Sequence, residues 1–230
     1  MKKFLKNELA GWKKFEVLWL TLASVIILGV SIYFEEGPIG IICGLTGVWC
    51  VILTGKGKLS SYIFGTINTV LYAYVAFNAK YYGEVMLNML YYFPMNFVGF
   101  YVWKKHMNEQ KSEVLKKRMP LNKSLLIYIV TAGAIFGYGL VLQKLGGNLP
   151  FVDSMSTVVS VVAQILCTMR LVEQWVLWIV VDVVTVIMWI AAFINGGESV
   201  ATLLMWSVYL INAIIMFVKW HKEAKKADAV

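Results

Sequence analysis

The stretch RLVEQWVLWIVVDVVTVIMWIAAFINGGE, residues 170–198, decides how the rest of the chain is interpreted. Its middle is one apolar run, and about 20 such residues suffice to cross a bilayer as a helix. Five side chains recur along it at intervals of 3, 4, 3 and 4 residues: Trp175, Trp178, Asp182, Thr185 and Trp189. That spacing places all five on one face of a helix, opposite Val, Ile, Leu and Ala.

Asp182 is the most informative residue of this stretch. A carboxylate in the middle of a membrane helix costs about 3 kcal/mol in lipid, so it is expected to face protein or a water-filled cavity. Flanked by indole rings and a hydroxyl, Asp182 is predicted to form part of a binding wall. The same pattern also suits a structural hydrogen bond between helices, with the tryptophans as packing residues.

The composition indicates an all-α integral membrane protein. The chain has 230 residues, of which 60% are hydrophobic and 15% charged, whereas a soluble domain has about 45–50% apolar and about 25% charged residues. The net charge of +8 is high, but the basic residues lie between apolar runs, where membrane topology explains them. No nucleic-acid partner is therefore expected.

Neither the cysteines nor the histidines suggest a metal site. Cys43, Cys50 and Cys167 lie in apolar segments without C-x-x-C spacing. His106 and His221 are each predicted to lie just beyond the end of a helix. The sequence therefore predicts no metal and no cofactor.

Apolar segments divide the chain into membrane helices. Residues 1–14 form a basic amphipathic opening, which is expected to lie along the membrane surface. Eight apolar segments follow, at about 17–34, 38–54, 60–79, 84–103, 123–142, 152–169, 175–195 and 199–218. The charged stretch 104–122 between them is predicted to be a solvated helical segment in a cytoplasmic loop.

Lys and Arg are distributed unevenly between alternate loops. If the N-terminus is inside, the inside segments hold 19 of the 21 basic residues, and the outside loops hold only Lys80 and Lys144. By the positive-inside rule this asymmetry predicts that both termini are cytoplasmic. The chain is expected to cross the bilayer several times.

The chain also repeats itself with a shift of 114 residues. The shift superposes polar residues of apolar helices: Thr46 on Ser160, Lys56 on Arg170, Asn68 on Asp182 and Tyr92 on Trp206. Two parallel three-helix repeats joined by a linker helix are therefore predicted, plus an extra N-terminal helix, as in sugar transporters of the SWEET type. The predicted divisions are an N-terminal segment and extra helix (1–37), repeat one (38–103), a loop and linker helix (104–150), repeat two (151–220) and a tail (221–230).

In transporters built from repeats, the substrate site lies near the midplane between them. Polar and aromatic side chains at that depth are therefore the candidates for substrate contacts. Aromatic faces stack on flat rings and attract cations, amides and hydroxyls match sugar hydroxyls, and a midplane carboxylate favours a cationic ligand. A nucleoside-like molecule or a small aromatic cation fits this set best.

Three strings carry a resemblance to a known family. They are KLSSYIFGTINTVLY from Lys58, the pattern N-x7-N-x2-G-x-Y-x-W from Asn88 to Trp103, and DSMSTVVSVVAQILCTMRLVEQWVLW from Asp153. Within the last, R-x2-E-x-W-x2-W from Arg170 to Trp178 is the most specific. Over residues 38–220 the chain resembles the bacterial nicotinamide riboside transporters, the PnuC family.

The resemblance implies a three-plus-one-plus-three helix fold, a homotrimer, and uptake of nicotinamide riboside for NAD synthesis by facilitated diffusion. It also implies that a separate cytoplasmic riboside kinase traps the substrate by phosphorylation. The substrate's positively charged pyridinium agrees with the Trp and Asp wall. The predicted substrate contacts are Asn68, Asn88, Tyr91, Asn96, Gln164, Trp178, Asp182, Trp206 and Asn212.

Two alternatives stay open from the residues alone. One is an ion-coupled transporter of another vitamin-like cation or nucleoside, such as thiamine. Ion coupling would need an acid or base inside the membrane, and Asp182 is the well-placed one. The other is an intramembrane enzyme, with Asp153 and Asp182 as a protease dyad. The Gly-x-Gly-Asp and His-Glu-x-x-His strings of intramembrane proteases are absent, so the protein is not expected to be an enzyme.

Overall fold

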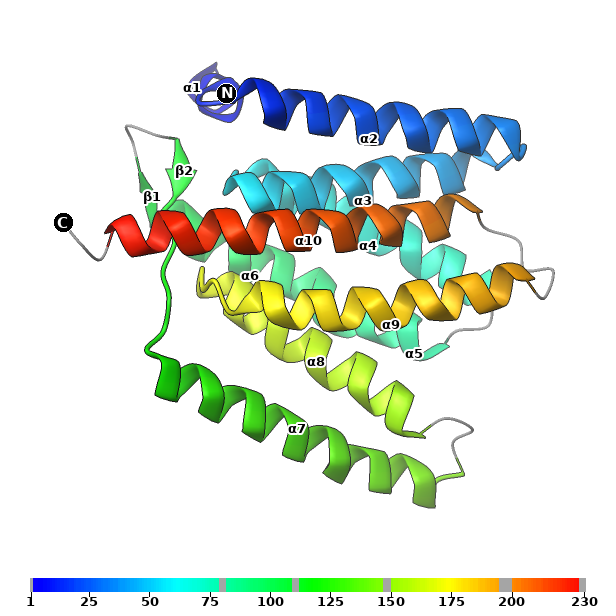
Figure 1. Ribbon diagram of the computed structural model, residues 1–230. Coiled ribbons are helices and arrows are strands. Elements are labelled where there is room, and N and C mark those ends of the chain that lie inside the picture. Colours follow the sequence, from blue (N-terminus) through cyan, green and yellow to red (C-terminus); the bar gives the residue numbers. More distant parts are fainter. Residues whose placement is uncertain (1, 79–81, 109–111, 147–149, 195–199, 228–230) are drawn as a thin grey trace. The chain divides into compact units, whose positions relative to one another are not determined.

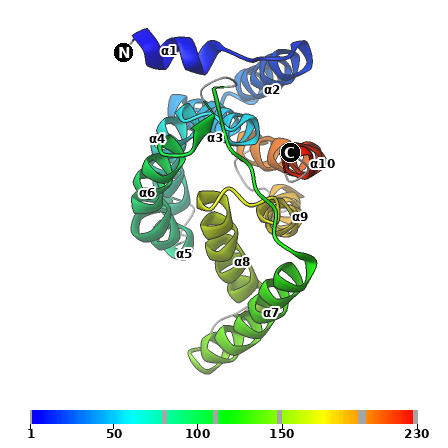
Figure 2. The same ribbon diagram turned by 90° about the vertical axis from the view of Figure 1, so that its left-hand side faces the viewer.

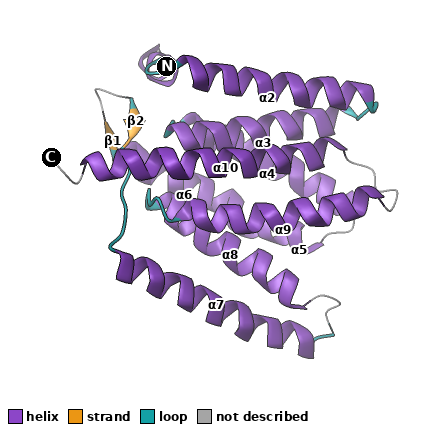
Figure 3. Cartoon of the chain, in the orientation of Figure 1, coloured by secondary structure: helices purple, strands orange, loops and turns teal. Residues whose placement is uncertain are grey.

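The computed structural model describes residues 2–78, 82–108, 112–146, 150–194 and 200–227. Within these ranges the chain is mostly helical and contains a short hairpin (Figure 1 and Figure 3). The helices are α1 (Lys2–Leu9), α2 (Lys14–Tyr33), α3 (Pro38–Lys56), α4 (Ser60–Asn78), α5 (Tyr82–Met86), the π-helix η1 (Leu87–Tyr92), α6 (Phe93–Lys104), α7 (Leu121–Lys144), α8 (Pro150–Thr168), α9 (Gln174–Ile194) and α10 (Val200–Ala227). The hairpin pairs β1 (Met107–Asn108) with β2 (Glu113–Val114) in antiparallel orientation.

Five helices in the described part of the chain are long and apolar enough to cross a membrane. They are Lys14–Tyr33, Pro38–Lys56, Leu121–Lys144, Pro150–Thr168 and Leu203–Lys225. Their exposed large apolar side chains are mainly Val, Ile, Leu and Phe, which suits contact with lipid. The chain is therefore a multi-pass helical membrane protein.

Local sequence signals set where α3 begins and ends. Pro38 stands in its first turn, where a missing N–H costs nothing. Gly57 follows its last residue with φ of 84°, and its N–H donates to the carbonyls of Leu53 and Thr54. This left-handed residue closes the helix and turns the chain into α4.

The chain divides into two compact units. The first comprises Met1–Leu115 and Val186–Asn212, and the second comprises Lys116–Thr185 and Ala213–Val230. In the first unit α3 packs against both α2 and α4. The core there is built from Ala23, Ile27, Cys43, Val48, Ile52, Tyr72, Met205 and Val208. In the second unit the main helix pair is α7 with α8 (Figure 2).

The prediction of a helical segment at 104–122 was wrong. The chain forms the β1–β2 hairpin there and then runs extended towards α7. Backbone hydrogen bonds hold it in place: the Val114 N–H donates to Gly57 O at 2.9 Å, and the Lys117 N–H donates to Arg170 O at 2.9 Å. Because carbonyls of other loops already accept hydrogen bonds from these backbone N–H groups, a local helix would not add hydrogen bonds for them.

The last helix is longer than predicted. It continues past residue 218 to Ala227, so His221 lies inside α10 and not beyond its end. Trp220 is fully buried and packs edge-on against Trp175, with ring centroids 5.5 Å apart. Glu223 pairs with the buried Lys116. These contacts extend the helix beyond its apolar run.

The helix predicted at 84–103 is not regular. It contains the π-helix η1, in which the Phe93 N–H donates to Asn88 O, five residues back. Pro94, in the first turn of α6, has no N–H to continue the α-helical pattern. The wider π turn therefore lies directly before the proline, and Asn88 and Asn96 are not related by the spacing of one regular α-helix.

Candidate functional site

Burial separates the two faces of α9 as its spacing predicts. Trp175 is 3% exposed, Asp182 2% and Thr185 8%, whereas Val183 on the opposite face is 39% exposed and Ile187 60%. A buried mid-helix acid with buried neighbours matches a protein-facing wall and not a lipid-facing surface. The second unit contains Asp182 together with two other predicted contacts, the half-buried Trp178 and the buried Gln164.

Asn68 on α4 is part of a close three-helix contact in the first unit. Its amide donates to Cys43 O on α3 at 2.8 Å and lies 4.0 Å from the sulfur of Met205 on α10. Gly47 makes this approach possible: an added Cβ would lie 2.1 Å from Tyr209 Oη and 2.8 Å from the Asn68 amide nitrogen. Asn68 therefore joins helices whatever else it binds.

Asn88 and Asn96 are both buried in the first unit, on either side of the change from π to α geometry. The Asn88 amide donates to Glu84 O at 2.8 Å within its own helix. The Asn96 amide donates to Thr69 Oγ1 on α4 at 3.3 Å. Each amide donates one of its two N–H groups, which leaves the second N–H and the carbonyl oxygen for a ligand with hydroxyl or amide groups.

Two aromatic candidates also lie in the first unit. Tyr91 packs beside Tyr92 with ring centroids 5.6 Å apart. Trp206 packs edge-on against Tyr72 and Tyr209, at 6.1 Å and 5.1 Å between centroids. These rings offer flat faces on which a planar ligand can stack.

Asn212 is the most completely bonded of the candidates. It is fully buried, donates to Val51 O at 3.0 Å and accepts from Trp19 Nε1 at 3.4 Å. It therefore ties α10 to α2 and α3, the structural role that buried amides often take in membranes.

Sequence reasoning missed two buried lysines, Lys56 and Lys58, which we call the lysine clamp. Lys56 forms ion pairs of 2.7 Å with both Glu16 and Glu113. Lys58 is fully buried, and its ammonium donates to the carbonyls of Asn7, Ala10 and Ser112 at 2.7, 2.7 and 2.9 Å. In the sequence the pair looked like ordinary loop charges.

The clamp holds the N-terminal segment and the hairpin against the turn between α3 and α4. Burial lowers the pKa of Lys58, a shift that the nearby Glu8 and Glu113 oppose. Glu8 also accepts from the backbone N–H of Ser60 at 3.2 Å, at the start of α4. The sequence does contain acidic residues, Glu8 and Glu16, upstream of the K-G-K string at Lys56. It does not show that these acids lie close to the two lysines.

The long apolar helices define a multi-pass membrane protein, and each of its two units contains buried polar side chains. A family model described as nicotinamide mononucleotide transporter matches residues 37–222. The chain belongs to this family of transporters, which are not enzymes.

Named relatives agree with this assignment. A nicotinamide riboside transporter PnuC of Neisseria mucosa is 40% identical over 96% of this chain and 86% of its own length. The protein of the same name from Haemophilus influenzae is 32% identical over 97% of each chain. A solved structure, described as the crystal structure of the vitamin B3 transporter PnuC, superposes with a TM-score of 0.87 at 40% identity, covering 97% of this chain and 98% of that one.

Proposed function

We propose that this protein carries nicotinamide riboside across the bacterial inner membrane by facilitated diffusion. A cytoplasmic kinase then phosphorylates the riboside and so traps it for NAD synthesis. The observation that carries the proposal is the buried α9 face around Asp182, in a chain 40% identical to a nicotinamide riboside transporter. The buried acid suits the pyridinium cation of that substrate.

The proposed recognition divides between ring and sugar. Asp182 and Trp178, both in the second unit, attract and stack on the charged ring, since indole faces favour cations. Trp206 is retained as a further aromatic contact predicted from the sequence. Amides and a phenol bind the hydroxyls of the ribose and the carboxamide. These groups belong to Asn68, Asn88, Tyr91, Asn96, Gln164 and Asn212.

Helix positions support the proposed three-plus-one-plus-three repeat. α4 begins at Ser60 and α9 at Gln174, 114 residues later, the interval found in the sequence. The turn before each helix contains a left-handed residue, Gly57 with φ of 84° and Arg170 with φ of 66°. On this scheme α2 is the extra N-terminal helix, both termini are cytoplasmic, and the assembly is a homotrimer.

Nicotinamide riboside and nicotinamide mononucleotide differ by a 5′-phosphate, so a binding measurement shows which of them the protein recognises. Titration calorimetry on the purified protein would compare nicotinamide riboside, its 5′-phosphate, free nicotinamide, thiamine and uridine. Selective binding of the riboside, with the phosphate rejected, is the expected result. Binding of the mononucleotide or of thiamine would overturn the substrate assignment.

Ion coupling is the second candidate function, because Asp182 is a buried acid inside a helix. Proteoliposome uptake distinguishes the two. Facilitated diffusion predicts equilibration of riboside without any ion gradient. Accumulation that depends on a proton or Na⁺ gradient would favour coupling.

A further inference from the structure

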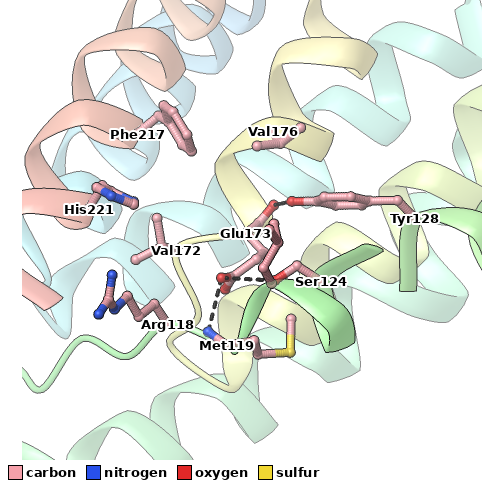
Figure 4. A pocket seen from close by; sticks show the side chains of 10 residues that line it. Arg118, Met119, Ser124, Tyr128, Val172, Glu173, Val176, Phe217 and His221 are labelled. Atoms are coloured by element: carbon pink, nitrogen blue, oxygen red, sulfur yellow. Dashed lines mark hydrogen bonds between the residues drawn. The ribbon is translucent and has the colours of Figure 1, made fainter. Parts of the chain in front are cut away.

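A pocket in the second unit has none of the residues assigned to the substrate in its lining. It has a volume of about 330 Å³ and is lined by residues of the loops before α7 and α9, of the first turns of these two helices, and of α10 (Figure 4). Its walls are mainly apolar, with Leu121, Val172, Val176 and Phe217 among the lining residues. Apolar walls at the ends of membrane helices lie at the depth where lipid headgroups meet acyl chains.

Glu173 is the polar centre of this pocket. It is only 8% exposed, yet one carboxyl oxygen, Oε2, is buried without a hydrogen-bond partner. The other oxygen accepts from the Met119 N–H at 2.9 Å and from Ser124 Oγ at 3.3 Å, which holds the group in place (Figure 4). A buried, unpaired carboxyl oxygen is costly unless a donor reaches it, so it indicates a missing donor.

Two basic side chains share this pocket with the acid. Arg118 and His221 line the pocket and are exposed. The site therefore combines a buried acceptor, an exposed positive rim and apolar walls.

We propose that this pocket binds the headgroup of an aminophospholipid, phosphatidylethanolamine. Its ammonium donates to Glu173 Oε2, its phosphate lies against Arg118 and His221, and its acyl chains follow the apolar walls. A charge-assisted bond from ammonium to carboxylate is stronger than one from a neutral hydroxyl. Phosphatidylcholine fills the same volume but has no N–H to donate.

The test is native mass spectrometry of the whole protein with phosphatidylethanolamine, its mono- and dimethyl derivatives, and phosphatidylcholine. The wild type is expected to retain phosphatidylethanolamine about tenfold better than phosphatidylcholine, since a hydrogen bond to a charged group has that order of effect. Retention is expected to fall as each methyl group replaces N–H. Equal retention of all four lipids would overturn the proposal. This comparison uses only the wild-type protein.

Glu173→Gln is expected to abolish the preference between the two lipids. Asp153→Asn is the matched control, because Asp153 is an exposed acid at the other end of α8, and it is expected to keep the preference. A Glu173→Gln variant that still discriminates between the lipids would contradict the proposal. Loss of riboside binding by Glu173→Gln in lipid-free detergent would likewise contradict it, because the pocket would then serve the substrate.

Discussion

At Gly47, side chains from two other helices converge on a position that has no side chain of its own. A Cβ there would lie 2.1 Å from Tyr209 Oη, and 2.8 Å from both the Asn68 amide nitrogen and the Met205 sulfur. Gly47→Ala is therefore expected to destabilise the protein by about 2 kcal/mol, the usual cost of overpacking. For a chain of this size that lowers Tm by about 5 °C, measured by thermal unfolding in detergent.

Gly29 provides the control for this substitution. It lies in α2, and an added Cβ would meet nothing within 4 Å. Gly29→Ala is expected to leave Tm unchanged or raise it slightly, because Ala favours helix over Gly by about 1 kcal/mol. Equal Tm values for the two variants would show that the three-helix contact at Gly47 is not tight.

Residue-scale roles were only partly predictable from the sequence. The burial of Asp182 and Thr185 followed from helical spacing, because one face of α9 is apolar and exposed. The partners of Asn212 did not follow, since they come from helices about 160 and 190 residues away in the sequence. A single sequence shows which side chains are polar, but not which of them are already bonded.

Among the elements, the lysine clamp joins α1 and the hairpin to the turn after α3. Lys58→Met would leave three carbonyls, of Asn7, Ala10 and Ser112, without their ammonium donor. The local free energy of unfolding is expected to fall by about 3 kcal/mol. Amides of residues 5–12 should then exchange hydrogen roughly 100-fold faster, as measured by mass spectrometry.

Lys14→Met serves as the control, because Lys14 is exposed at the start of α2. It should leave exchange in this segment unchanged. If Lys58→Met exchanged no faster than Lys14→Met, the clamp would not hold the N-terminal segment.

The π-helix predicts an unusual tolerance to deletion. A π turn contains one residue more than an α turn, so removing the exposed Leu90 converts η1 to α-helix and keeps the register of both flanks. The Leu90 deletion should therefore give a monodisperse protein on size-exclusion chromatography. Deleting the exposed Ile67 within the regular helix α4 rotates everything after it by about 100° and should abolish folding. Failure of both deletions would contradict this explanation of η1.

Helix positions were the most predictable feature of the fold. Apolar length and the signals at Pro38 and Gly57 locate elements without tertiary information. The hairpin was missed because charged loops and solvated helices have similar compositions. What holds the hairpin in place is the hydrogen bond from Lys58 to the distant carbonyl of Ser112, which a single sequence does not show. The π turn was missed because Pro94 was read as part of a regular helix.

At the scale of the whole molecule, the uneven distribution of Lys and Arg predicts cytoplasmic termini. In a variant lacking Cys43, Cys50 and Cys167, a membrane-impermeant maleimide should label Lys144→Cys in intact cells. It should label Lys222→Cys only after permeabilisation. The reverse pattern would invert the proposed topology.

The central claim is that the Asp182 face recognises a positively charged riboside. The most direct measurement is the affinity of wild type and Asp182→Asn for nicotinamide riboside and for its uncharged dihydro form. Loss of an interaction between charges of opposite sign should weaken riboside binding about tenfold and affect the dihydro form little. Equal losses for both ligands would contradict charge recognition at this face.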